Sequence, residues 1–205
     1  MKFKFFWAAL FLSVSCIAAP NDPPVIATLL KPSVYKDVTT DRSVMAHASL
    51  DDLPVMVSKD VPLKKYSFYS AMLVNASLAE THKILTDYPL YPKLVPYIEQ
   101  ADFNAETKVL TLQGGIWKYV MRSLVHFEDK GERWVHFTIV GGHFYGLQGN
   151  IFFERFNEKS TLVYLNGEMT GTNWPPTFII ERGAEVGFTF TGRKMRSYIE
   201  DHNKK

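Results

Sequence analysis

The chain has 205 residues, enough for one domain with a substantial hydrophobic core. Its 23 basic and 21 acidic residues leave a formal net charge of +2. This near balance excludes the strongly basic surface that nucleic-acid-binding proteins use, so we predict no nucleic-acid partner.

The first 19 residues are typical of a secretory signal peptide. Lys2 and Lys4 supply a positive start, Phe5 to Leu12 is an unbroken apolar run, and no acidic residue occurs before Asp22. The apolar run is shorter than the roughly 20 residues that a membrane-spanning helix needs. We therefore predict export, with the periplasm as the destination. An uncleaved anchor is the alternative.

Cys16 is the only cysteine, and two fates are open to it. Cys16-Ile17-Ala18 places small residues at both recognition positions for a cut before Ala19. The run Leu12-Ser13-Val14-Ser15-Cys16 also resembles a lipobox, although Leu12 lies one position too far upstream, so a lipid anchor on Cys16 is the alternative. If residues 1–19 are removed, 21 basic and 21 acidic residues remain. No disulfide, thiol nucleophile or cysteine–metal site is then available.

Residues 20–60 differ in composition from the rest of the chain. Four prolines interrupt any early regular element: Pro20, Pro23, Pro24 and Pro32. We predict an extended N-terminal arm that drapes over a ligand-binding domain of residues 61–205. A disordered linker between signal and domain is the alternative.

Alternating side chains from Tyr66 to Val74 predict a strand with both faces largely covered. Ser77-Leu-Ala-Glu80 follows and forms a capping box, in which the Ser77 hydroxyl accepts the Glu80 backbone N–H. A helix should therefore run from Leu78 to near Asp87. Three prolines within the next ten residues allow only short helical turns after it.

Five further strands are predicted over residues 109–112, 119–127, 134–140, 150–156 and 161–169. Val125 and Phe127 should share the buried face with Val135. Because directly paired residues lie on one face, their numbers must sum to an even value, which demands a loop of three or five residues. His126 and His136 then lie together on the outer face. They lack a third ligand at matching spacing, so we predict no metal site.

From Thr177 to Asp201 the periodicity becomes helical. One stripe contains Ile180, Ala184, Gly187, Thr191, Met195 and Tyr198. The charged residues on the opposite side are Glu181, Arg182, Glu185, Arg193, Arg196 and Glu200, whereas Lys194 falls on the flank of the stripe. Gly183 and Gly187 lie on or beside the stripe, where they permit close approach of the sheet or leave room for a ligand. A strand over Val186 to Thr191 is the alternative.

Three segments, taken in this order, resemble the START-like (SRPBCC, helix-grip) superfamily, and its polyketide cyclase/dehydrase and coenzyme Q-binding branch in particular. They are Asp87-Tyr88 through Tyr91-Pro92 to Pro96-Tyr97, Gly142-His-Phe-Tyr-Gly-Leu-Gln-Gly149, and Trp174-Pro175-Pro176 before the long helix. The resemblance covers about residues 62–202. It implies an α+β fold, in which a curved antiparallel sheet of six to seven strands grips the C-terminal helix and two short helices follow the first strand.

Members of this superfamily hold lipids, isoprenoid quinones or polycyclic molecules between sheet and helix, and many are not catalysts. The ligand-lining residues that we predict here are Tyr88, Tyr91, Tyr97, Met121, Phe137, Phe144, Gly187, Thr191, Lys194 and Met195. Tyrosines offer apolar faces with one hydroxyl each, which suits an amphiphilic ligand, although ordinary packing of the short helices is the alternative. Lys194 could meet a ligand carboxylate or phosphate, or extend into solvent.

We therefore predict an exported carrier or binding protein for an apolar ligand such as a lipid, fatty acid or isoprenoid. Contact with a membrane is part of this prediction, whereas a cofactor, a metal and a catalytic residue are not. One alternative is a cyclase- or hydrolase-type enzyme in the same cavity, with His143 or Lys194 as its polar group. Another is an envelope module that binds a partner protein through residues 20–60.

Overall fold

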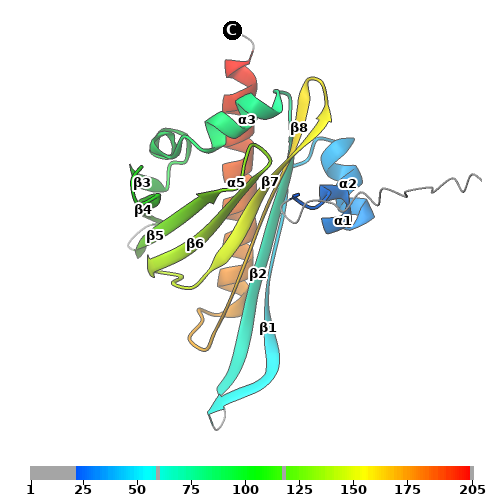
Figure 1. The fold of residues 1–205 in the computed structure, drawn as a ribbon. Helices are drawn as coiled ribbons and strands as arrows, with labels where there is room; N and C mark the ends of the chain where they lie inside the picture. The colour runs from blue at the N-terminus through cyan, green and yellow to red at the C-terminus, as the bar shows by residue number, and fades with distance from the viewer. Residues whose placement is uncertain (1–21, 59–60, 117–118, 204–205) are drawn as a thin grey trace, which may run out of the picture.

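The computed structural model describes residues 22–58, 61–116 and 119–203. Within these ranges, one antiparallel sheet has eight strands in the order β1-β2-β8-β7-β6-β5-β4-β3 (Figure 1). The strands are β1 (Met45–Ser58), β2 (Val61–Val74), β3 (Ile98–Asn104), β4 (Val109–Ile116), β5 (Tyr119–Asp129), β6 (Trp134–Gly142), β7 (Gln148–Asn157) and β8 (Ser160–Gly171). The helices are α1 (Ile26–Leu29), α2 (Pro32–Thr39), α3 (Leu78–Leu85), the 3-10 turn η1 (Tyr88–Leu90), α4 (Tyr91–Leu94) and α5 (Thr177–His202).

The helix-grip architecture is confirmed: α5 packs on one face of the open sheet, and short helices follow β2. The strand alternative for residues 186–191 is wrong, because they lie inside α5. The predicted cap at the start of α3 is present, since the Glu80 N–H donates to the Ser77 hydroxyl at 3.3 Å. Among the described residues, we find no helix long and apolar enough to cross a membrane.

The sheet has eight strands, slightly more than the six to seven predicted, and β1 and β3 are the two whose residues were not assigned to a strand. Residues 45–58, which were predicted to belong to the arm, pair with β2 from Met45↔Ala71 onward. As an edge strand, β1 accommodates Pro54 and two adjacent aspartates, which a central strand would exclude. The predicted domain boundary after residue 60 therefore falls between two strands of one hairpin.

The predicted extended arm contains two helices, α1 and α2, which pack on the face of the sheet opposite to α5. Ile26 is fully buried, and its N–H donates to Glu154 Oε2 at 2.7 Å. Together with Leu30 and Val38 it covers an apolar patch formed by β2, β7 and β8. The prolines that seemed to forbid regular structure instead precede or begin these helices: Pro32, for example, is the first residue of α2, where its missing N–H costs nothing.

The predicted pairing of β5 with β6 is confirmed. Phe127 pairs with Phe137, and the last pair, Asp129↔Val135, encloses the five residues 130–134. His126 and His136 lie on the outer face as predicted, but two residue positions apart along the ladder, since they pair with Thr138 and Glu128. Among the described residues, no group of three or more His, Cys, Asp and Glu side chains could hold a metal ion.

Candidate functional site

The charged side of α5 lies against the edge of the sheet. The Leu50 N–H donates to Glu181 Oε1 at 2.8 Å, and His47 Nδ1 lies 3.0 Å from Glu185 Oε1. Nearer the carboxyl end, Glu200 accepts the Asn75 N–H at 3.0 Å and pairs with Arg42. Glu181 thus accepts a backbone N–H of the edge strand β1, whereas Glu200 accepts one just beyond the end of β2. The sequence separates these charges from the apolar stripe, but it does not indicate that they bind β1.

Among the glycines of α5, Gly192 lies closest to a neighbouring segment. A Cβ at Gly192 would lie 2.7 Å from Val44 Cγ1, so this position admits no side chain without movement of the start of β1. The prediction for Gly183 needs correction, because it is exposed and a Cβ there would meet no atom within 4 Å. At Gly187 an added Cβ would find only the Tyr97 hydroxyl, at 3.8 Å. One flank of α5 thus has free space beside its backbone.

Three predicted site residues meet at this flank. The Tyr97 hydroxyl donates to the Gly187 carbonyl at 3.0 Å and forms a short hydrogen bond with the Thr191 hydroxyl. Burial raises the pKa of Tyr97, an effect that the Thr191 contact partly offsets, so the phenol is neutral at physiological pH. Tyr97 therefore fastens the segment between α4 and β3 to the middle of α5.

Tyr88 and Tyr91 pack at the other end of the same short helical segment. Tyr88 is buried and stacks on Phe127 with ring centroids 4.2 Å apart, while the Tyr91 hydroxyl donates to the Leu85 carbonyl at 2.7 Å. Burial raises the pKa of both phenols well above 10. Both tyrosines contribute to the packed wall, and the Tyr91 hydroxyl is bound to the protein's own backbone.

An apolar wall faces α5 across the sheet. α5 packs mainly on β1 and β2, so the concave side chains farther along the sheet are only partly covered. The partly accessible members of this wall are Leu112, Phe127, Ile139, Phe144, Ile151, Leu165 and Met169. At the rim, Met121 is 42% exposed. From the helix side, Phe188 enters this space and stacks on Phe68 with centroids 4.5 Å apart.

The remaining predicted residues divide between core and surface. Phe137 and Met195 are buried, and Phe144 occupies the turn between β6 and β7 with a positive φ of 59°. Lys194 is exposed, with its ammonium 5.6 Å from the centre of the Phe190 ring, as the solvent alternative predicts. His143 Nδ1 lies 3.1 Å from both the backbone N and O of Arg122, so its ring is bound to the main chain.

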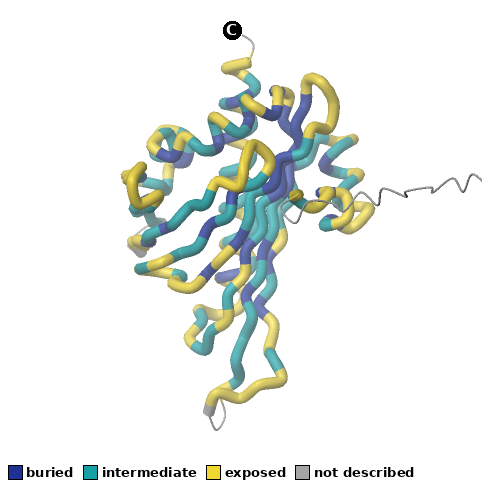
Figure 2. The backbone as a smooth tube through the Cα atoms, viewed as in Figure 1, coloured by how far each residue is buried: buried dark blue, intermediate teal, exposed yellow. Residues whose placement is uncertain are grey.

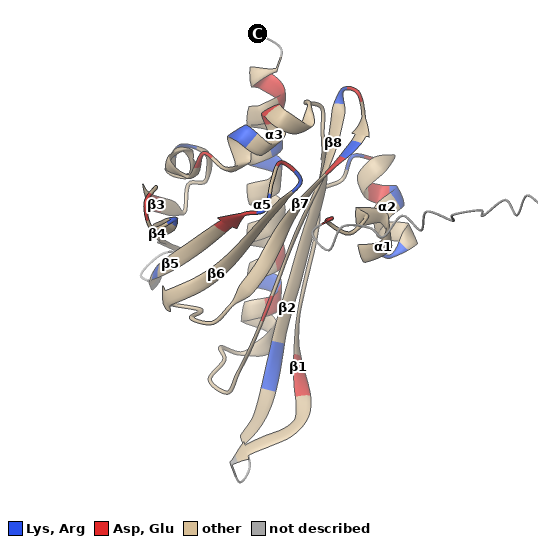
Figure 3. Ribbon diagram, viewed as in Figure 1, with Lys and Arg blue, Asp and Glu red and all other residues tan. Residues whose placement is uncertain are grey.

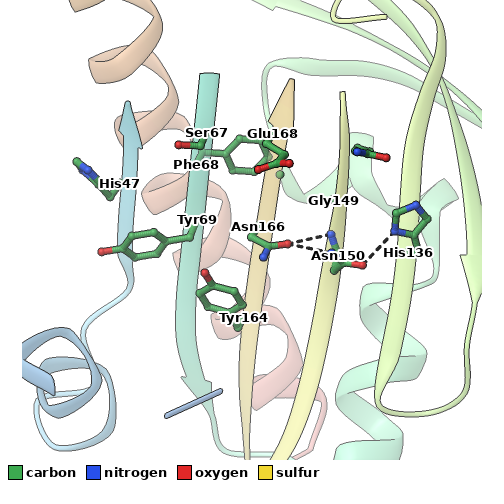
Figure 4. A pocket seen from close by; sticks show the side chains of 12 residues that line it. His47, Ser67, Phe68, Tyr69, His136, Gly149, Asn150, Tyr164, Asn166 and Glu168 are labelled. Atoms are coloured by element: carbon green, nitrogen blue, oxygen red, sulfur yellow. Dashed lines mark hydrogen bonds between the residues drawn. The ribbon is translucent and has the colours of Figure 1, made fainter. Parts of the chain in front are cut away.

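Two grooves lie outside the space between the sheet and α5. One, of about 460 Å³, separates the start of β1 from the outer side of α5. The other, of about 440 Å³, lies on the convex face and is lined by polar side chains (Figure 4). There Asn150 donates to Asn166 Oδ1 at 3.3 Å and its own Oδ1 lies 3.0 Å from His136 Nδ1. Strand alternation places these polar residues on one face, but the sequence alone does not predict a groove there.

No family model matches the sequence, and no curated protein sequence matches it. Solved structures do match. A START superfamily protein from Mycobacterium smegmatis has a TM-score of 0.58 at 16% identity, covering 66% of this chain and 98% of its own. The chain has the START-like helix-grip fold.

Two further START-like structures are named for a reaction. The Zhui aromatase/cyclase from Streptomyces sp. R1128 has a TM-score of 0.52 at 12% identity and covers 68% of this chain and 94% of its own. The di-domain ARO/CYC BexL of the BE-7585A biosynthetic pathway has a TM-score of 0.54 at 11% identity. The match spans 69% of this chain and half of BexL. At these identities the likeness establishes the fold alone.

Proposed function

We propose that this chain is an exported carrier for an apolar ligand of the lipid, fatty acid or isoprenoid class, held between the concave face of the sheet and α5. One observation carries the proposal: an apolar wall stays partly accessible opposite the flank of α5 at Gly187, where an added Cβ would meet only the Tyr97 hydroxyl. Removal of the ligand's apolar surface from water would supply about 25 cal/mol per Å².

The polar groups around this space suit an amphiphile. The Tyr97 and Thr191 hydroxyls lie at its edge, and two hydroxyls can orient a ligand head group without a charged partner. Lys194 stands outside on the helix surface, where it could attract a carboxylate arriving from solvent but would not hold a buried one.

Uptake of a fluorescent fatty acid tests this proposal, with a matched pair of variants on α5. Gly187→Trp fills the flank beside Tyr97, whereas Val186→Trp adds the same indole on the exposed side of the helix. We expect binding at least tenfold weaker in Gly187→Trp and unchanged binding in Val186→Trp, with thermal unfolding confirming that both fold. Absence of uptake by the wild type, or equal binding by both variants, would contradict the proposal.

A cyclase-type enzyme in the same space is the second candidate, and the names of the Zhui and BexL structures favour it. Mass spectrometry of an organic extract separates the two functions. A carrier releases the offered molecule unchanged, whereas an enzyme releases an altered molecule in amounts that grow with time.

Export is also a proposal, since residues 1–19 and Cys16 lie outside the described residues. It depends on the signal-like sequence alone. The intact mass of the protein recovered from the cell envelope tests it: a cut before Ala19 and a lipid on Cys16 give different masses. Recovery of the full-length chain from the cytoplasm would contradict export.

A further inference from the structure

The groove on the convex face is crossed by two adjacent rows of polar side chains. Strand pairing aligns the first row from β1 to β6: His47, Tyr69, Asn166, Asn150 and His136. The second row lies two residues farther along each strand and consists of Ser67, Glu168, Gln148 and Thr138. Because neighbouring strands lie about 4.8 Å apart, the first row is about 19 Å long. Figure 4 shows its members on successive strands.

Hydrogen bonds fix the two asparagines at the centre of the first row. The Trp134 indole N–H can only donate, so the Asn150 atom that it contacts at 2.9 Å is the carbonyl oxygen. His136 Nδ1, 3.0 Å from the same oxygen, therefore carries a proton and donates it. The amide nitrogen of Asn150 then faces Asn166 Oδ1, which also accepts the Asn150 backbone N–H at 3.1 Å. A ligand would meet amides that are already oriented, which lowers the entropic cost of binding.

An aromatic ring lies beside these amides. Tyr69 is partly exposed and stacks on the buried Tyr164, with ring centroids 6.0 Å apart and planes inclined by 22°. Tyr164 in turn stacks on Phe152, and both belong to the patch that α1 and α2 cover. The Tyr69 ring is thus supported from one side while part of it faces solvent. Such a ring offers a flat apolar contact next to hydrogen-bonding groups.

The charges around the groove are balanced within the protein. Among the described residues, its lining contains no lysine or arginine. Its carboxylate, Glu168, pairs with Lys65 at 2.6 Å. Figure 3 shows no charged residue along β6 or in the first half of β7. An anionic ligand would therefore find no free cation here, and a neutral ligand is favoured.

An ordinary solvated sheet face is the alternative, since such a face also alternates buried and exposed residues, as β6 does (Figure 2). Two observations favour a binding site. The central side chains are bound to one another, and they border a volume of about 440 Å³, within the roughly 300–1,000 Å³ of ligand sites. At the groove's edge, Gln148 is exposed and its side-chain amide forms no hydrogen bond with a described residue, so it is available to a ligand.

We propose that this groove binds a neutral oligosaccharide. Sugar hydroxyls both donate and accept, which matches the amides, and the C–H face of a sugar ring can pack on Tyr69. An apolar ligand would deprive the amides of water without replacing its hydrogen bonds. An extended peptide would gain its main-chain hydrogen bonds at a sheet edge, whereas this groove lies on a face. The space between the sheet and α5 is on the opposite face, so this inference does not depend on the carrier function.

Titration with maltohexaose, cellohexaose and chitohexaose, followed by nuclear magnetic resonance, tests the proposal. We expect at least one of these neutral sugars to shift the side-chain amide signals of Gln148, Asn150 and Asn166. A sulfated heparin hexasaccharide is the anionic comparison and should bind more weakly than that sugar.

Two pairs of variants assign the binding to the groove. Tyr69→Ala removes the exposed ring and should weaken binding about tenfold. Its control is Tyr198→Ala, which removes a partly exposed ring near the end of α5. Gln148→Ala removes one exposed amide and should weaken binding about fivefold, the usual effect of one hydrogen bond. Gln100→Ala, at an exposed position of β3, is its control. Both controls should bind within twofold of the wild type, and thermal unfolding checks that all four variants fold.

Four outcomes would overturn the proposal. They are no binding of any of the three neutral sugars to the wild type, tighter binding of the heparin hexasaccharide than of each neutral sugar, equal affinity of either groove variant and its control, and signal shifts confined to the concave face, at residues such as Ile139 and Leu165.

Discussion

At the scale of single residues, Tyr97 decides how the short helical segment joins α5. Tyr97→Phe keeps the ring but removes hydrogen bonds to the Gly187 carbonyl and the Thr191 hydroxyl. We expect the free energy of unfolding to fall by about 1 kcal/mol, the usual net value of such a bond. Tyr145→Phe at an exposed tyrosine is the control and should change nothing. Urea unfolding measures both, and equal stability of Tyr97→Phe and wild type would contradict this role.

The glycines of α5 provide a second test at this scale. Gly183→Ala should stabilise the protein by up to about 1 kcal/mol, because alanine is the better helix former and its Cβ meets open space. Gly192→Ala should lose that gain, since its Cβ would lie 2.7 Å from Val44 Cγ1. The two melting temperatures decide the matter: the same increase in both variants would mean that α5 is not held closely against Val44.

Helical periodicity places Gly187 and Thr191 on one face of α5, but it does not predict that Tyr97 reaches them from the segment between α4 and β3. It could not place Lys194, which lies at the margin of the apolar stripe, where a small rotation of the helix decides between interior and solvent. The sequence also does not predict the surroundings of Gly183 and Gly192, because these depend on how α5 docks against the rest of the fold and not on the helix alone.

At the scale of elements, the contact of α5 with β1 should respond to pH. Partial burial raises the pKa of Glu185, but hydrogen bonds from His47 and the Ala48 backbone, with Arg182 nearby, leave it below its ordinary value of 4.5. A depressed folded-state pKa stabilises the protein above the unfolded-state pKa, and the contribution is lost as pH falls through the folded value. Wild type should therefore exceed Glu185→Gln in stability at about pH 7, and the two should converge at about pH 3. Urea unfolding across this range that gave a constant difference would contradict the assignment.

The helices α1 and α2 should contribute to stability as a core element does. Ile26→Ala removes a fully buried side chain and should lower the free energy of unfolding by about 2–5 kcal/mol. Val25→Ala at the exposed neighbouring position is the control. Chemical unfolding of both variants distinguishes this packing from a disordered linker, for which neither substitution would matter.

The sequence predicts six of the strands and the short helices after β2, because their alternation and capping are local. The sequence does not predict β1 and β3, for different reasons. β1 contains Pro54 and the pair Asp51-Asp52, features that an edge strand tolerates but that suggest a loop. β3 buries only Ala101, so its alternation is too weak to indicate a strand. Both are held by pairing with a neighbour, which a single sequence does not show.

At the scale of the whole molecule, the sheet is covered unevenly. α1 and α2 cover one part of its convex face, and α5 covers mainly the β1–β2 side of the concave face. The apolar wall that α5 leaves partly accessible is the proposed ligand site.

The most direct test of the carrier function locates the ligand in solution. Nuclear Overhauser effects are measured between a bound fatty acid and the protein's methyl groups. The account predicts contacts with Leu112, Ile139 and Leu165, which face α5, and none with Leu162, which lies under α1 and α2. Contacts confined to the convex face, or a fatty acid that shows no contact with the concave wall, would contradict it.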